Sequence, residues 1–185
     1  DYARFEQWKK YKTYNDVNSI DHGDLAITLL FDNKEIYNFY DEEADFYKIK
    51  LAIKYHNKIK VPATVKNDEL MLCNIIRDAD KLDIFNLKIQ QKSLLAEDDK
   101  EISNNIKEKF FDNNMINYKD LKSKNDKIIL TLAMFYDINS DFSYKYIVNN
   151  KIIEKLFDKI EDKEKYKKYF EHITEFVENR LENIQ

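Results

Sequence analysis

Three polar side chains, those of His22, His56 and Asp80, stand on predicted helical faces whose other members are apolar. His22 begins a face that continues with Leu25, Ala26, Leu29 and Leu30. His56 ends a face made by Ile49, Ala52 and Ile53. Asp80 lies in the middle of a face made by Cys73, Ile76, Ile84 and Leu87. Helical spacing therefore predicts that all three polar side chains point toward the protein interior.

A shared divalent cation would account for the three residues together. An unpaired buried carboxylate is costly, so Asp80 needs a cation, a set of hydrogen bonds or a proton. Imidazole and carboxylate groups bind Mn, Fe, Zn or Mg ions, and such an ion supplies the positive charge that a buried acid requires. Ordinary explanations also exist: a histidine at a helix end is often a hydrogen-bonded core or capping residue, and Asp80 could pair with Arg77 or Lys81. Spacing alone leaves both interpretations open.

The composition predicts an all-α fold for the 185 residues. The chain has one glycine, Gly23, and one proline, Pro62, which are too few turn residues for a sheet with tight hairpins. A chain of this length suits a single domain with a substantial core. After a short opening helical segment, we expect helices near 21–31, 41–58, 67–89, 101–111, 126–138 and 163–185. The last of these carries an apolar stripe made by Tyr166, Phe170, Ile173, Val177, Leu181 and Ile184.

Charge and cysteine content exclude several classes of protein. The net charge of −4 and the lack of a basic stripe argue against binding to nucleic acid or to anionic lipid. One cysteine, Cys73, excludes an internal disulfide and fits a reducing compartment, and we expect it to be a small core residue. No apolar run approaches the ~20 residues that span a bilayer, and no signal peptide is visible. The expected location is the cytoplasm, and we expect His172 at the surface or boundary of the last helix.

Four short segments, in order, resemble the HD-domain metal-dependent phosphohydrolases. They are "DYARFEQ", "DHG", "AIKYHNK" and "IIRDADKLDI", of which "YHNK" and "RDADKLD" are the most specific. That superfamily is named for an adjacent His-Asp doublet within the series His…His-Asp…His…His…Asp. The resemblance covers about residues 1–90. It implies a single helical HD-like bundle in which 1–91 holds the metal site and 92–185 adds C-terminal helices.

The resemblance implies a metal-ligand set. Asp1 resembles the Asp of the doublet, because "D-x-x-R-F-E-Q" is similar to the stretch that follows the doublet in bacterial members. His22 and His56 match the two later histidines, which occur in members that hold two metals. Asp80 matches the final Asp. Asp78 is the rival for that role, and helical geometry favours Asp80 because Asp78 falls off the apolar stripe described above.

The implied activity is hydrolysis of a phosphoester of a nucleotide or other small phosphorylated molecule. Asp1 would bridge two divalent ions, and Asp1 and Asp80 are thereby implied as catalytic residues. Two such ions lower the pKa of a shared water, aim it at phosphorus and neutralise charge as the leaving oxygen departs. Arg4 and Lys81 are the expected contacts to the substrate phosphate, although both also fit ordinary solvated cations.

The sequence also departs from the family's pattern. The His of the doublet and an earlier His would precede Asp1, so we expect a longer native chain. Arg4 and Phe5 stand where alarmone-hydrolysing relatives carry an acidic pair, which argues against that substrate. The alternative to an enzyme is a non-catalytic HD-like helical module that has lost its metal and binds a ligand or a protein partner. Residues 92–185 carry no motif, and their expected roles are to cover the pocket, set substrate size or form a homodimer interface.

Overall fold

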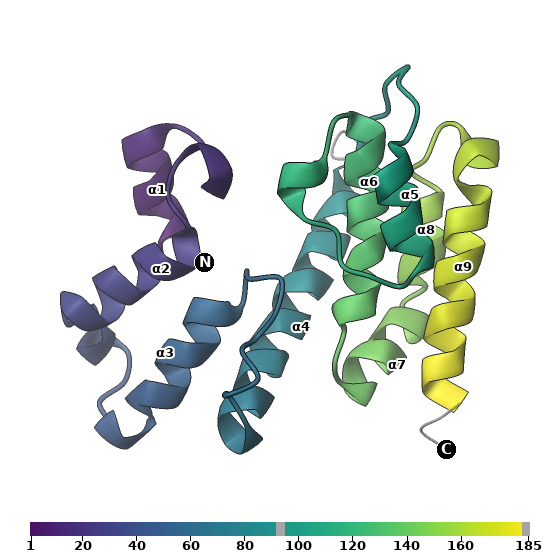
Figure 1. Cartoon of the computed structure of the whole chain (residues 1–185). Helices are drawn as coiled ribbons and strands as arrows, with labels where there is room; N and C mark the ends of the chain where they lie inside the picture. Colours follow the sequence, from purple (N-terminus) through teal and green to yellow (C-terminus); the bar gives the residue numbers. More distant parts are fainter. Residues whose placement is uncertain (92–94, 183–185) are drawn as a thin grey trace. The chain divides into compact units, whose positions relative to one another are not determined.

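The computed structural model describes residues 1–91 and 95–182, and every regular element in these ranges is helical (Figure 1). The predicted all-α fold is confirmed. The chain divides into two compact units, Asp1–Arg77 and Asp78–Gln185. The division falls within the helix α4 (Asn67–Gln90), after Arg77. No helix in the described ranges is long and apolar enough to cross a membrane.

The first unit is built from α1 (Arg4–Tyr11), α2 (His22–Ile27), α3 (Phe46–Tyr55) and the beginning of α4. The Asp21 carboxylate caps α2 by accepting a hydrogen bond from the Asp24 amide. Helix α2 packs against α3, and the contact is close. A Cβ atom on Gly23 would lie 2.9 Å from Oδ1 of Asn57 and 3.2 Å from the Ile53 carbonyl oxygen. The only glycine of the chain therefore permits the approach of these two helices.

The core of the first unit is small, and a buried cation supports it. One cluster of its buried apolar residues consists of Ala52, Val65 and Cys73, which confirms the expected core position of the cysteine. The buried Arg77 guanidinium donates hydrogen bonds to the carbonyls of Tyr55 and Lys58, each at 2.6 Å. These carbonyls lie at the C-terminal end of α3, where a helix dipole favours a positive charge. Arg77 thus holds the end of the helix that carries His56.

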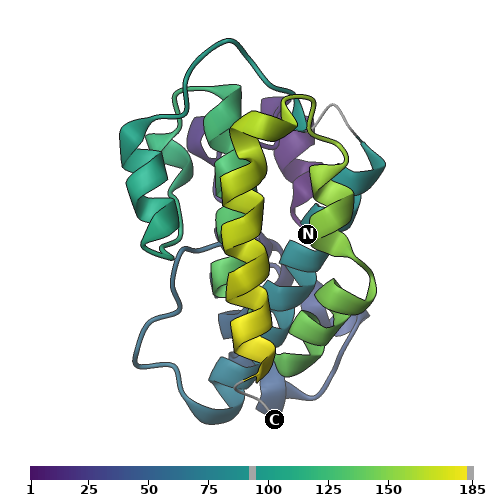
Figure 2. The same ribbon diagram turned by 90° about the vertical axis from the view of Figure 1, so that its right-hand side faces the viewer.

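The second unit contains the end of α4 together with α5 (Asn104–Phe111), α6 (Lys124–Ala133), α7 (Asp141–Asn149), α8 (Ile152–Phe157) and α9 (Lys163–Glu182). Helix α9, drawn in yellow in Figure 2, runs lengthwise against α6, α7 and α8. Its predicted apolar stripe is buried at Tyr166, Phe170, Ile173 and Val177, and Leu181 is partly buried. Ile184 lies outside the described residues.

The predicted buried stripe of α4 is wrong. Ile76 is 37% exposed and Leu87 is 41% exposed, although both were expected to face the interior with Asp80. The most deeply buried positions of α4 are instead Cys73, Arg77, Asp78, Lys81 and Phe85.

The difference has a physical cause. A periodicity argument assigns Arg and Lys to the solvent face, whereas Arg77 and Lys81 are buried against acceptors distant in the sequence. Lys81 Nζ lies 2.6 Å from a carboxylate oxygen of Asp137, and Arg77 binds backbone carbonyls. Long side chains can bury their stems where their charges are satisfied. The face at i, i+4, i+8 and i+12 therefore buries two charged residues together with Cys73 and Phe85.

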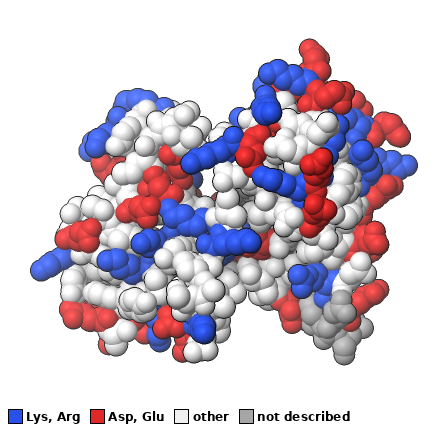
Figure 3. All heavy atoms as spheres, viewed as in Figure 1, with Lys and Arg blue, Asp and Glu red and all other residues white. Residues whose placement is uncertain are grey.

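The surface is charged in both signs. On the face drawn in Figure 3, Lys and Arg side chains are interspersed with Asp and Glu side chains on each unit. This mixture agrees with the small net charge of −4.

Candidate metal centre

The structure brings three of the predicted residues together in the first unit. One ligand atom from each of Asp1, His22 and His56 lies within 4.8 Å of the other two. The two Nε2 atoms are 2.8 Å apart, and Oδ1 of Asp1 lies 3.3 Å from Nε2 of His22 and 3.8 Å from Nε2 of His56. Both imidazoles are buried, whereas the Asp1 side chain is 56% exposed. Within residues 1–91 and 95–182, no other trio of His, Cys, Asp and Glu side chains has this geometry.

The hydrogen bonds of His22 determine which of its ring nitrogens carries the proton. Its Nδ1 lies 2.7 Å from Oδ2 of Asp16. The other oxygen of Asp16 accepts hydrogen bonds from Nη1 of Arg4 at 2.9 Å and from Nε2 of Gln7 at 2.8 Å. Asp16 is therefore an ionised acceptor, and Nδ1 of His22 must be the donor to it. The lone pair of Nε2 therefore faces Asp1 and His56. We call Asp1, His22 and His56 the trio.

His56 has the same arrangement through a different acceptor. Its Nδ1 lies 2.6 Å from the carbonyl oxygen of Ile53, one turn earlier at the end of α3. A carbonyl oxygen can only accept, so Nδ1 carries the proton and Nε2 is again bare. Ligand histidines in metal sites commonly donate their second ring N–H to a carboxylate or a backbone carbonyl in this way.

Nε2 of His22 and Nε2 of His56 are 2.8 Å apart, and two unprotonated nitrogens at this distance repel each other unless a positive charge lies between or beside them. Either a metal ion or an extra proton on one imidazole provides that positive charge. The carboxylate of Asp1 completes a set of two nitrogens and one oxygen, which suits Mn, Fe or Zn. Three protein ligands leave coordination positions open, as in catalytic rather than structural metal sites.

Comparisons of this chain with protein-family models, with curated proteins and with solved structures find no match. The likeness to HD-domain phosphohydrolases thus rests on the residues and motifs quoted above.

The loop before α2 brings Asp16 to His22. Gln7 is fully buried in α1, and its Nε2 donates to Ser19 Oγ at 2.9 Å and to the Ile20 carbonyl at 2.9 Å as well as to Asp16. Arg4 Nη1 adds a hydrogen bond to the Tyr14 carbonyl at 2.7 Å. These contacts hold the loop against α1. Asp16 begins the short helix Asp16–Asn18, which precedes α2 in this loop.

Several donors keep Asp16 ionised. Burial raises the pKa of Asp16, but the hydrogen bonds from His22 and Gln7 and the positive charge of Arg4 outweigh burial and hold its pKa well below the ordinary range. Burial likewise raises the pKa of Asp21, and the hydrogen bonds from Lys58 and Asn57 lower it overall. Both carboxylates are therefore negative over the whole neutral range.

Asn57, the residue after His56, links the two carboxylates. Its Nδ2 donates to Oδ2 of Asp16 at 3.1 Å and to Oδ1 of Asp21 at 3.0 Å. Its Oδ1 is buried and has no hydrogen-bond partner among the described residues. The functional roles of Asp16, Gln7 and Asn57 were not foreseen from the sequence. The sequence signals were the position of Gln7 at the end of the "DYARFEQ" segment and that of Asn57 within the "YHNK" segment.

The two predicted phosphate-binding cations occupy different settings. The Arg4 guanidinium is engaged with Asp16, Gln7 and the Tyr14 carbonyl, and its Nε lies 3.7 Å from Oδ1 of Asp1. Lys81 belongs to the second unit, where it is buried and paired with Asp137. Binding of a substrate phosphate by either residue stays a prediction.

Asp80 also belongs to the second unit and is partly exposed. Its rival Asp78 is 2% exposed, and its carboxylate accepts hydrogen bonds from the backbone amides of Asn139 and Ser140, each at 2.9 Å. Preference for Asp80 on the ground that it faces inward is therefore wrong, because Asp78 is the buried member of the pair. The role of Asp80 as the final metal ligand stays a prediction.

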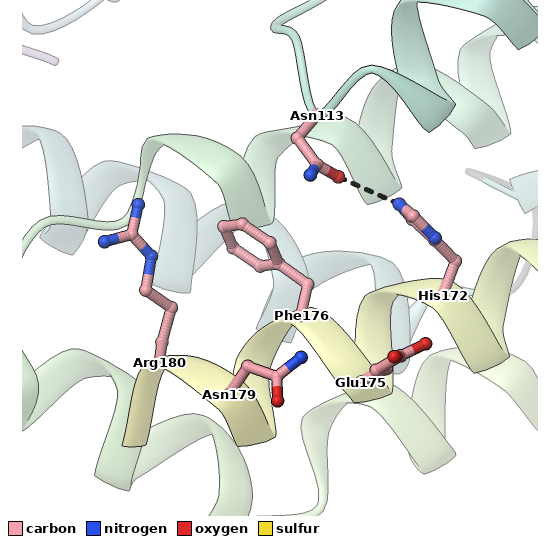
Figure 4. A pocket seen from close by; sticks show the side chains of 6 residues that line it. All are labelled: Asn113, His172, Glu175, Phe176, Asn179 and Arg180. Carbon is pink, nitrogen blue, oxygen red and sulfur yellow. Dashed lines mark hydrogen bonds between the residues drawn. The ribbon is translucent and has the colours of Figure 1, made fainter. Parts of the chain in front are cut away.

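His172 lies apart from these residues in chain order and has other partners. It is partly exposed, as expected for a boundary position, and its Nε2 lies 2.8 Å from Oδ1 of Asn113. Both residues line an open pocket of about 350 Å³ in the second unit (Figure 4). The other lining residues come from α9 and are Glu175, Phe176, Asn179 and Arg180. His172 thus serves as a natural control for the two histidines of the trio.

Proposed function

We propose that the first unit binds a divalent metal ion through Asp1, His22 and His56, and that the protein is a metal-dependent phosphohydrolase. The substrate class is a phosphoester of a nucleotide or another small phosphorylated molecule. The observation that carries the metal site is the 2.8 Å approach of two imidazole Nε2 atoms whose Nδ1 protons are both used elsewhere.

Different observations support the two parts of this proposal. The metal ion is supported by the geometry and by the acceptors that hold Nδ1 of both imidazoles. Hydrolysis of a phosphoester is supported by the order of the HD-like segments and by the open coordination positions that three ligands leave. A bound divalent ion would supply Lewis acidity toward a phosphoryl oxygen and a lowered pKa for water. The chain's own contribution is to hold the ligands in place and to keep the imidazoles free of protons on Nε2.

Metal binding is tested first, by calorimetry on protein stripped with a chelator. Titration with Mn²⁺, Fe²⁺, Zn²⁺ and Mg²⁺ in turn should reveal at least one equivalent of tight binding for one of these ions. His22→Ala and His56→Ala should each weaken this binding by at least about 100-fold, because each removes a direct ligand. His172→Ala is the matched control and should bind as the unaltered protein does. Equal affinity in His22→Ala and His172→Ala would overturn the assignment of the trio.

Hydrolysis is tested on the metal-loaded protein with a panel of nucleotides and simple phosphate esters, with phosphate or nucleotide products as the readout. Turnover that is lost on chelation and in His56→Ala, but kept in His172→Ala, is the expected result. A protein that binds metal and hydrolyses none of these compounds would overturn the hydrolase and favour the non-catalytic module.

A further inference from the structure

We propose that Asp16 is the positioning residue of this centre. Its carboxylate fixes His22 in the tautomer that points a bare Nε2 at the trio, and it joins the chain segments that carry the three ligands. This inference rests on the metal site proposed above and adds a residue that is itself no member of the trio.

The first step is the connectivity of Asp16. The three members of the trio stand on separate segments: Asp1 precedes α1, His22 begins α2 and His56 follows α3. Asp16 is hydrogen-bonded to a side chain from each of them. It accepts from Arg4 and Gln7 of α1, from His22 of α2 and from Asn57, which follows His56. One carboxylate therefore ties together the elements on which the trio depends.

The second step is the number of donors that meet Asp16. Oδ1 receives Arg4 and Gln7, and Oδ2 receives His22 and Asn57, at distances from 2.7 to 3.1 Å. A carboxylate can accept from all four because both of its oxygens are acceptors. No other side chain of this size offers two acceptor atoms and no donor. An asparagine at this position would place its NH2 group, a donor, either toward the donors Arg4 and Gln7 or toward the donors His22 and Asn57.

The third step is what Asp16→Asn does to His22. The guanidinium of Arg4 holds the remaining oxygen of the amide on its own side, because a charged donor makes the stronger hydrogen bond. The NH2 group then faces Nδ1 of His22, which has to become an acceptor. The imidazole proton then moves to Nε2, which can no longer bind a metal ion because its lone pair is protonated. The substitution keeps the size of the side chain and changes only its hydrogen-bonding character.

The experiment compares Asp16→Asn with Asp21→Asn in the full chain. Asp21 is a second carboxylate that accepts from Asn57, but it caps α2 and no described hydrogen bond joins it to His22. Asparagine is also a good N-cap residue, so Asp21→Asn should fold normally. Affinity for Zn²⁺, measured by calorimetry, should fall about 10- to 100-fold in Asp16→Asn and stay within about twofold in Asp21→Asn.

The second readout is the tautomer of His22 in the metal-free protein, observed through ¹⁵N chemical shifts of the imidazole nitrogens at about pH 8, where an ordinary imidazole is neutral. The proton should sit on Nδ1 in the unaltered protein and in Asp21→Asn, and on Nε2 in Asp16→Asn. A merely structural role for Asp16 would lower stability without moving this proton. An unchanged tautomer with unchanged Zn²⁺ affinity in Asp16→Asn overturns the role of Asp16 while the metal site stands. Failure of the unaltered protein to bind any of the four ions overturns the metal site itself.

Discussion

The Nε2 atoms of His22 and His56 lie 2.8 Å apart, although the Nδ1 proton of each ring is given to a different acceptor. Two neutral imidazoles in these tautomers cannot hydrogen-bond to each other, because each presents a lone pair to the other. A metal ion, or an extra proton on one imidazole, would supply the positive charge that removes this repulsion. The carboxylate of Asp1 beside the two imidazoles adds the negative charge and the oxygen ligand that a divalent ion favours.

The spacing of α2 and α3 should depend on Gly23. Alanine in its place would gain about 0.5–1 kcal/mol from helix propensity. The new Cβ would also lie 2.9 Å from Oδ1 of Asn57 and 3.2 Å from the carbonyl oxygen of Ile53, and overlap of this kind costs about 1–3 kcal/mol. The cost of the overlap should exceed the gain in helix propensity. Gly23→Ala should therefore lower the free energy of unfolding, and it should weaken metal binding by moving His22 away from His56.

Fluorescence of Trp8, the only tryptophan of the chain, reports unfolding of the first unit during a urea titration of this variant. The matched control is Asp24→Ala, an exposed position in the same helix, which should change stability by less than about 1 kcal/mol. A Gly23→Ala protein as stable as the unaltered one, with the same metal affinity, would show that α2 and α3 do not need this close contact.

The first unit should lose stability in acid because of Asp16. Its pKa in the folded protein is lowered, so the unfolded chain binds a proton at a higher pH than the folded one does. Stability that Asp16 contributes is thus complete above the ordinary carboxyl pKa of about 3.9 and is lost as the pH falls below it. Urea midpoints followed by Trp8 fluorescence should decline from about pH 5 to about pH 2.

The slope of this decline should be smaller in Asp16→Asn, which has no carboxyl group to protonate at this position. It should not vanish, because the pKa of Asp21 is also lowered and acts in the same direction. Identical slopes for the unaltered protein and for Asp16→Asn would show that Asp16 does not stabilise the folded state through its charge.

Asp78 should be required for the second unit, and Asp80 should not. Asp78→Ala removes an acceptor from the amides of Asn139 and Ser140 and from Nδ2 of Asn139, which should cost about 3 kcal/mol. Asp80→Ala at a partly exposed position should cost less than about 1 kcal/mol in metal-free protein. Hydrogen exchange at the amides of Asn139 and Ser140 gives the local readout, and it should accelerate only in Asp78→Ala. Equal protection in both variants would contradict the role assigned to Asp78.

Much of the local structure follows from the sequence alone. One glycine and one proline in 185 residues exclude a sheet with tight hairpins, and apolar spacing places α9 and its buried stripe. The Asp21 cap also follows from local chemistry, because its partner is the amide three residues later. The inward direction of His22 and His56 follows from helical periodicity. All of these features depend on neighbours that are close in the chain.

Tertiary structure decided the rest, because the remaining features depend on partners distant in sequence. Periodicity predicted a buried face of α4 through Ile76 and Asp80, yet carbonyls at the end of α3 and the carboxylate of Asp137 make the burial of Arg77 and Lys81 favourable and turn the buried face away from Ile76. Asp16 lies in a loop and carries no sequence signal of a role. Only the fold brings four hydrogen-bond donors to its carboxylate. The sequence alone determines the helical class, the stripe of α9 and the inward direction of His22 and His56, whereas folding determines which acceptors hold their Nδ1 protons and so leaves the two Nε2 atoms facing each other.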